Sequence, residues 1–212
     1  MNETKHAVTS VITTNAGVSV TVRTSGDESE KVYLLTRNTV RELGLAEGME
    51  IGEDLLGVLE DEAQLGRAEA RMVRILSYSD HSVSLLVRKL VSYGFSKEIA
   101  ERAAESAVRA GYIKEDEQAR SSAEYFLRHK YWGKKRIAME LMSRGYAREA
   151  ISGAIESLGD ESFRVMLVKL IEKKFPDCPT ERDEAEKMKS SLCRMGYSIS
   201  EINSAMREVY GA

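Results

Sequence analysis

Three ten-residue stretches decide the fold of this chain: LVRKLVSYGF at residues 86–95, IAMELMSRGY at residues 137–146 and MKSSLCRMGY at residues 188–197. Each stretch ends in a glycine followed by an aromatic residue. The glycines Gly94, Gly145 and Gly196 are 51 residues apart (145 − 94 = 51 and 196 − 145 = 51), and each has a leucine four residues before it. Self-similarity at a fixed period is typical of tandem copies of one supersecondary unit.

The residues that follow each glycine also repeat. Their apolar positions have the i, i+3, i+4, i+7 spacing of one helix face. A glycine between two such helices fits a helix stop with positive φ, and the aromatic residue after it fits the apolar contact that closes such a turn. Each unit is therefore expected to contain a helix, a glycine stop and a second helix. The three matching sets are Ala100, Ala103, Ala104 and Ala107; Ile151, Ala154, Ile155 and Leu158; and Ile202, Ala205, Met206 and Val209.

The N-terminal part of the chain has a different composition. The segments VTSVITT, VSVTVRT and KVYLLT within residues 7–36 are rich in Val, Ile and Thr. This pattern predicts short strands in a meander, with turns at residues 15–17 and 25–29. The segment RNTVRELGL predicts a short helix that ends at Gly44, and from about Asp61 onward the pattern is helical almost throughout.

We therefore expect a mainly α protein: an elongated solenoid of three tandem three-helix repeats with a small N-terminal β-rich extension. The predicted parts are residues 1–60, 61–112, 113–159 and 160–212. Such repeats pack mainly on their neighbours and offer a long concave surface, which favours binding to a polymer or filament. Ser79 or Asp80 is a candidate cap for the helix that contains Val83, and Ser198 with Glu201 forms a candidate capping box.

The composition of the chain indicates in which cellular compartment the protein is expected to act. The chain has 212 residues, a net charge of −3 and only two cysteines, Cys178 and Cys193, for which no disulfide is expected. The sequence contains no run of about 18 apolar residues and no secretory signal at its start. We expect a monomeric cytoplasmic protein that does not associate with membranes.

No residue pattern in the sequence indicates a catalytic site. The histidines His6, His81 and His129 lie in unrelated segments, and none has a cysteine or carboxylate at metal-ligand spacing. His81 and His129 are expected to be solvated. Gly133-Lys134 lacks the rest of a phosphate-binding loop, and the serine motif of hydrolases does not occur. The sequence predicts no catalytic residue, no metal and no cofactor.

Charge is distributed unevenly along the chain. Residues 41–66 carry eight acids and one base, a balance of −7, whereas residues 125–148 carry seven bases and one acid, a balance of +6. Within the basic region, RHKYWGKKR at residues 128–136 mixes bases with Tyr131 and Trp132. Bases neutralise phosphates, and aromatic rings stack on nucleobases or anchor protein interfaces. The alternative is a solvated helix end with Trp132 packed between helices, and for Trp132 packing is favoured. The candidate binding residues are Arg88, Lys89, Arg128, Lys130, Tyr131, Trp132, Lys134, Lys135, Arg136, Arg144 and Arg194.

One segment of the chain resembles a known protein family: AGYIKEDEQARSSAEYFLRHKYWGKKRIAMELMSRGY, residues 110–146. This segment resembles the RecX family of bacterial recombination regulators. The segments LGLAEGMEIGEDLLGVLEDE and SDHSVSLLVRKLVSYGFSKEIAERAAESAVRAGYI are similar to it as well. Gln118 departs from the pattern, because the family commonly has an aromatic residue there. The matching positions are Gly111, Tyr112, Ile113, Glu115, Asp116, Ala119, Gly133, Ile137, Glu140, Leu141, Gly145 and Tyr146.

The resemblance implies a non-catalytic modulator of the RecA recombinase in DNA repair and the SOS response. It would bind the RecA–single-stranded DNA filament and restrain filament extension, ATP hydrolysis and strand exchange. Charge reversal of Lys134, Lys135 and Arg136 is expected to weaken this inhibition and leave the fold intact. The acidic segment 41–66 would face basic RecA surface. The alternatives are a helical module that binds DNA independently of RecA, and a generic helical adaptor that binds neither.

Overall fold

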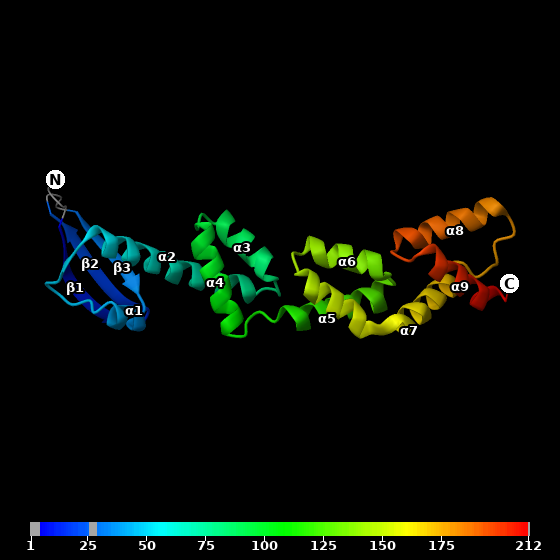
Figure 1. Ribbon diagram of the computed structural model, residues 1–212, viewed down its shortest axis with the longest axis horizontal. Helices are drawn as coiled ribbons and strands as arrows, with labels where there is room; N and C mark the ends of the chain where they lie inside the picture. Colours follow the sequence, from blue (N-terminus) through cyan, green and yellow to red (C-terminus); the bar gives the residue numbers. More distant parts are fainter. Residues whose placement is uncertain (1–4, 26–28, 212) are drawn as a thin grey trace. The chain divides into compact units, whose positions relative to one another are not determined.

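The computed structural model describes residues 5–25 and 29–211, and Figure 1 labels its helices and strands. The chain forms two compact units. Unit 1 contains residues 1–79 and 86–112, and unit 2 contains residues 80–85 and 113–212. Within the described ranges, no helix is both long enough and apolar enough to cross a bilayer.

Unit 1 begins with a four-stranded antiparallel sheet. The strands β1 (His6–Thr14), β2 (Gly17–Thr24), β3 (Glu30–Leu35) and β4 (Glu50–Ile51) are arranged in the order β3-β2-β1-β4. Along β2, Val18, Val20 and Val22 are buried and the residues between them are more exposed, as expected for a strand with one face on a core. The predicted meander is therefore confirmed. Part of the second predicted turn, residues 26–28, lies outside the described residues.

Two helices cover the buried face of this sheet and extend from it. Helix α1 (Arg37–Glu42) is short, and Gly44 follows it with a φ of 62°, as predicted. Helix α2 (Glu53–Leu76) packs Leu59 into the core formed by the sheet. Further along α2, Ala68 and Met72 are buried on the side that meets α4 (Lys97–Arg109).

Helix α2 begins earlier than the sequence suggested. It runs without a break across the expected boundary at residue 60, starting after Gly52 with Glu53 and Asp54 in its first turn. Acids at this place are stabilised by the helix dipole. The four-part division of the chain stays a prediction.

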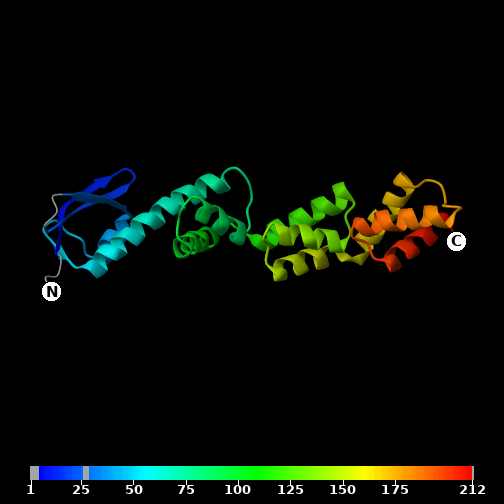
Figure 2. The same ribbon diagram turned by 90° about the horizontal axis from the view of Figure 1, so that it is seen from above.

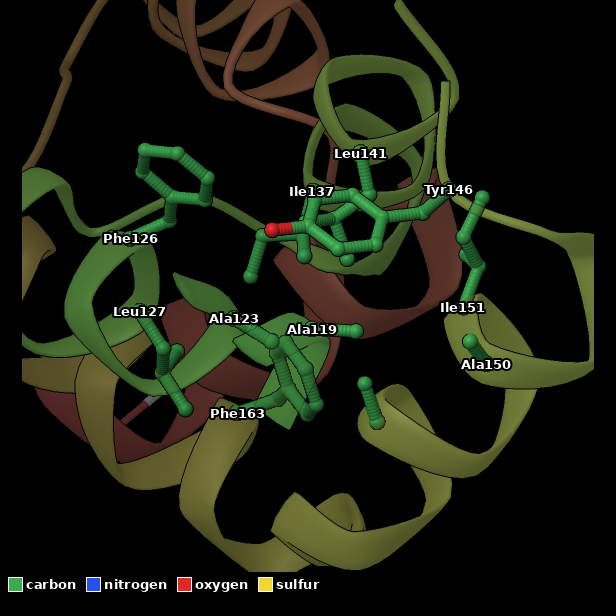
Figure 3. Close-up of a cluster of buried hydrophobic side chains, with 11 residues drawn as sticks. Ala119, Ala123, Phe126, Leu127, Ile137, Leu141, Tyr146, Ala150, Ile151 and Phe163 are labelled. Atoms are coloured by element: carbon green, nitrogen blue, oxygen red, sulfur yellow. The ribbon is translucent and has the colours of Figure 1, made fainter. Parts of the chain in front are cut away.

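Unit 2 consists of two small helical cores that share one long helix. Figure 3 shows the first core, in which α5 (Glu115–Lys130), α6 (Lys134–Ser143) and the first part of α7 (Arg148–Lys174) surround Tyr146. The second core joins the last part of α7 to α8 (Arg182–Arg194) and α9 (Ile199–Tyr210), which Figure 2 shows beside each other. Helix α7 bends at Gly159, whose φ is 69°, where the sequence placed the end of the second repeat.

The three glycine stops form as predicted. Gly94, Gly145 and Gly196 have φ values of 92°, 81° and 97°. In each turn the amide of the aromatic residue donates to the carbonyl five positions earlier, for example Tyr146 N to Leu141 O at 3.2 Å. The helices that follow start at Lys97, Arg148 and Ile199, which preserves the spacing (148 − 97 = 51 and 199 − 148 = 51). The mainly α fold with an N-terminal sheet is confirmed, while the number of repeats and their elongated stacking stay predictions.

Two predictions about the segment before α3 (Val83–Ser92) are wrong. The cap is neither Ser79 nor Asp80, because the Ser82 hydroxyl accepts the Leu85 amide at 3.2 Å. His81 is not solvated: only 4% of it is exposed. The reason lies in neighbouring hydrogen bonds, since the Ser82 hydroxyl and the Val83 amide both bond to other parts of unit 2 and hold this segment against it.

Candidate interaction surface

The basic region of unit 2 is built around a junction at which α8 ends and α6 begins. The Gly133 amide donates to Met195 O at 2.8 Å, and the Lys135 amide donates to Gly196 O at 3.3 Å. The Arg136 guanidinium donates to Arg194 O at 3.1 Å. The first amides of α6 and the last carbonyls of α8 lack partners within their own helices, so each end satisfies the other. In Figure 1, α8 leads toward the start of α6.

The same relationship occurs one period earlier in the sequence. The Ser82 hydroxyl, before α3, donates to Arg144 O, at the end of α6, at 2.7 Å. Ser82 is 51 residues before Gly133 (133 − 82 = 51), and Arg144 is 51 residues before Met195 (195 − 144 = 51). One position therefore uses a side-chain hydroxyl, and the other a backbone amide, to bond a carbonyl at the end of a later helix.

The two aromatic residues of the basic stretch are packing residues. The half-buried Trp132 stacks on Phe126, with ring centroids 4.8 Å apart, and the Arg136 guanidinium lies 4.6 Å from the Trp132 ring centroid. Tyr131 has a φ of 55° at the end of α5 and packs against the second core. The structure shows packing of Trp132, which is the favoured interpretation of the sequence, and both aromatic residues are partly buried. A binding role for the two rings stays a prediction.

Four of the candidate bases already have partners in the protein. Arg128 pairs with Glu124 at 2.8 Å, and Lys134 pairs with Asp160 at 2.5 Å. Arg144 pairs with Glu140 at 2.9 Å and lies over the Phe126 ring, 4.9 Å from its centroid. Arg136 bonds to the end of α8, as described above. Lys134, Arg136 and Arg144 thereby link different elements of unit 2, whereas the Arg128 pair lies within α5.

The other candidate bases are uncommitted. Within residues 5–25 and 29–211, no ion pair or hydrogen bond engages the charged group of these residues: Arg88 and Lys89 on α3, Lys130 on α5, Lys135 on α6, and Arg194 on α8. Lys130, Lys135 and Arg194 belong to unit 2, where Lys135 and Arg194 flank the α8–α6 junction. Arg88 and Lys89 belong to unit 1, so a continuous row of bases along the chain stays a prediction.

This division bears on the expected effect of charge reversal. Reversing Lys134 and Arg136 would break an ion pair and a bond across the α8–α6 junction, so it would change contacts within unit 2 as well as the surface charge. That the fold stays intact in such a variant remains a prediction. Lys130 and Lys135 can be reversed without the loss of an ion pair or a hydrogen bond.

The sequence pattern did not single out two exposed methionines on α6. Met139 and Met142 lie on the face of the helix opposite the buried Ile137 and Leu141.

The acidic segment 41–66 is partly neutralised within unit 1. Glu60 pairs with Lys31 at 2.9 Å, and Glu62 pairs with Arg102 at 2.5 Å. The Lys31 ammonium holds the pKa of Glu60 below its usual value. Glu53 lies 3.1 Å from the buried His6 imidazole. Much of this charge therefore serves the fold of unit 1, which leaves less of it for a basic partner.

A cavity of about 290 Å³ lies between α7 and α9, with Lys134 at its edge. Its charged lining is occupied by ion pairs, including Lys134 with Asp160 and Arg164 with Glu161. Burial raises the pKa of the Tyr197 hydroxyl, which also lines it. In the part of the chain that the structure describes, no group of His, Cys, Asp and Glu side chains could hold a metal ion.

The fold and this surface define a mainly helical protein that carries a small sheet and presents uncommitted bases at helix junctions. No protein-family model matches the sequence. A curated relative, the regulatory protein RecX of Caldanaerobacter subterraneus subsp. tengcongensis, is 26% identical over 180 residues, which are 84% of this chain and 89% of the relative.

Two solved structures share the fold. A crystal structure of regulatory protein RecX superposes with a TM-score of 0.73 at 19% identity, over 94% of this chain and 99% of that one. The crystal structure of RecX from Lactobacillus salivarius has a TM-score of 0.63 at 18% identity, over 70% of this chain and 98% of that one. The predicted resemblance is confirmed, because the chain is similar to RecX regulatory proteins over most of its length.

Proposed function

We propose that this protein is a non-catalytic regulator that binds the RecA–single-stranded DNA filament and restrains its extension, ATP hydrolysis and strand exchange. It would act in the cytoplasm, as a monomer, during recombination and DNA repair. The observation that carries the proposal is the similarity to a curated RecX regulatory protein, which extends over most of both chains.

The uncommitted bases of unit 2 are consistent with such a partner. Lys130, Lys135 and Arg194 are exposed and can attract either the acidic surface of a protein filament or the phosphates of its DNA. Their neighbours at the α8–α6 junction are held by backbone hydrogen bonds, so these bases are presented from a fixed scaffold. A scaffold of this kind lowers the ordering cost of binding.

The experiment is the ATPase activity of RecA on single-stranded DNA, measured over a titration of the protein. We expect wild-type protein to lower the rate, and Lys130→Glu/Lys135→Glu to require a several-fold higher concentration for the same effect. Lys169→Glu/Lys187→Glu is the matched control, because it reverses two exposed lysines of unit 2, on α7 and α8, that also have no ion-pair partner in the described residues. An unchanged ATPase rate at saturating wild-type protein would refute the proposal.

A second titration distinguishes the proposed function from its alternative, in which the protein binds DNA without RecA. The protein, without RecA, is titrated into labelled single- or double-stranded DNA at several salt concentrations, and binding is measured by fluorescence anisotropy. Tight binding with a steep dependence on salt, and no ATPase effect beyond competition for DNA, would establish the alternative instead. The proposed regulator inhibits at concentrations at which binding to naked DNA is weak.

A further inference from the structure

The outward face of α6 combines a base with exposed apolar residues. Lys135, Met139 and Met142 follow the i, i+4, i+7 spacing that places side chains on one face of a helix. Met139 is 71% exposed and Met142 is 57% exposed, while Ile137 and Leu141 fill the core on the opposite side. These three residues, Lys135, Met139 and Met142, are called the α6 face below.

The exposure of two neighbouring methionines, Met139 and Met142, is evidence about the function of this surface. Large apolar side chains that cluster on a surface mark interaction sites. Methionine is unbranched and polarisable, so it adapts to irregular partner surfaces. Because Ile137 and Leu141 already provide the core contacts of α6, the two methionines are not needed to hold the helix in place.

The equivalent face of α8 lacks these features. One period later, Lys135 is replaced by Glu186 (186 − 135 = 51), Met139 by Ser190 and Met142 by Cys193. The combination of a base and two methionines is therefore not a requirement of the repeat itself. It sets α6 apart from α8, although the same kind of junction joins both helices to their neighbours.

Resting on the proposed function, we propose that the α6 face docks an acidic and apolar segment of the filament's protein, not its DNA. Lys135 would pair with a carboxylate of that segment, and the two methionines would cover its apolar side chains. Lys135 and Met142 are seven residues apart, which is about 10 Å along a helix. A single amphipathic helix or strand of the partner can span this length. It would contact Lys135, Met139 and Met142 together if it carried an acidic residue about 10 Å or less from its apolar residues.

Charge and chemistry favour a protein over a nucleic acid at this face. A phosphate backbone would use Lys135 but would gain nothing from Met139 and Met142. The two bases beside Lys135, Lys134 and Arg136, are engaged within unit 2. A protein segment that carries both acid and apolar groups uses the whole face, because burying the methionines adds apolar area to the charge attraction.

The test compares three variants of the full chain in binding to RecA filaments assembled on labelled single-stranded DNA, and to that DNA alone. We expect Met139→Ser/Met142→Ser to weaken filament binding by about tenfold or more. Lys135→Glu should weaken it with a reduced dependence on salt, and neither variant should change binding to naked DNA by more than about twofold. The control, Ile199→Ser, removes a 51%-exposed side chain from α9 and should bind like wild type.

The outcomes distinguish this inference from the proposed function. If wild-type protein does not bind filaments, the proposed function fails and the docking proposal fails with it. If wild type binds and the methionine variant binds equally well, only the docking proposal is overturned. Loss of naked-DNA binding in the methionine variant would assign the face to nucleic acid. Light scattering that shows a wild-type dimer and a monomeric variant would assign it to a second copy of the chain. Either result overturns the proposal.

Discussion

Gly133 and Gly196 lie so close together that neither position has room for a side chain. A Cβ added to Gly133 would lie 2.6 Å from the carbonyl oxygen of Gly196, and one added to Gly196 would lie 2.5 Å from the backbone nitrogen of Arg136. Gly133 has an ordinary φ of −79°, so its need for glycine is steric, whereas Gly196 also has a φ of 97°. The α8–α6 junction is therefore a backbone-to-backbone contact.

Replacing Gly133 with alanine should destabilise unit 2. The added methyl group forces apart two backbone segments that share hydrogen bonds, and overpacking of this kind costs about 1–3 kcal/mol. Chemical denaturation followed by circular dichroism measures the free energy of unfolding. Gly153→Ala is the control, because Gly153 is helical, has open space around it and should gain up to about 1 kcal/mol. Equal stability of Gly133→Ala and wild type would show that the junction yields easily.

Ser82 should matter more to stability than its neighbour Ser84. The Ser82 hydroxyl donates to Arg144 O and accepts the Leu85 amide, and Ser82 is buried. Ser82→Ala removes both bonds of a buried hydroxyl and leaves the Arg144 carbonyl without this donor, so we expect a loss of about 1–2 kcal/mol of unfolding free energy. Ser84→Ala, on the exposed side of α3, should change it by less than about 0.5 kcal/mol. Similar losses in the two variants would contradict the assigned role of Ser82.

The periodic part of the fold was predictable from the sequence because its signals are local. Gly94, Gly145 and Gly196 stop helices by their own backbone preference, and the apolar spacing around them needs only helix geometry. The capping box at Ser198 and Glu201 forms as predicted, since both partners lie within one turn. Such features do not depend on where the rest of the chain lies.

The features that sequence reasoning missed depend on distant partners. Gly133 pairs with a turn 63 residues later (196 − 133 = 63), and nothing near Gly133 indicates this contact. His81 is buried because its neighbours bond to α5 and to the end of α6. The sequence also treated the bases of residues 128–136 as equivalent. Whether a base is committed depends on acids such as Asp160, which a local pattern does not reveal.

Tyr146 and Tyr197, one period apart, should respond differently to loss of the hydroxyl group. The Ser122 side chain interacts with the Tyr146 hydroxyl and lowers its pKa, against the larger opposite effect of burial. The buried Tyr197 hydroxyl has no hydrogen-bond partner within the described residues. Tyr146→Phe should therefore lower the unfolding free energy by about 0.5–1.5 kcal/mol, and Tyr197→Phe should leave it unchanged or raise it. Both are read from urea denaturation, and a larger loss for Tyr197→Phe would indicate an unrecognised partner of that hydroxyl.

Glu60 provides a prediction about acid stability in unit 1. Its carboxylate accepts hydrogen bonds from the Lys31 ammonium at 2.9 Å and from the Tyr33 hydroxyl at 3.3 Å. The bond from Lys31 is the main reason that the pKa of Glu60 lies below its ordinary value of 4.5, and partial burial opposes it. A carboxyl group whose pKa is lowered by folding stabilises the folded state above the unfolded-state pKa. The contribution disappears as the pH falls through the folded-state pKa.

Glu60→Gln should therefore lower the unfolding free energy at pH 7 and have no such effect in acid. Because the pair is largely solvated, the difference at pH 7 should be only about 0.5 kcal/mol, and it should shrink as the pH falls from about 5 to about 3. The measurement is urea denaturation of both proteins over that pH range, with Glu47→Gln as control, since Glu47 is exposed and has no ion-pair partner in the described residues. A difference that grows in acid would have the wrong sign and would show that Glu60 is strained, not stabilised, beside Lys31.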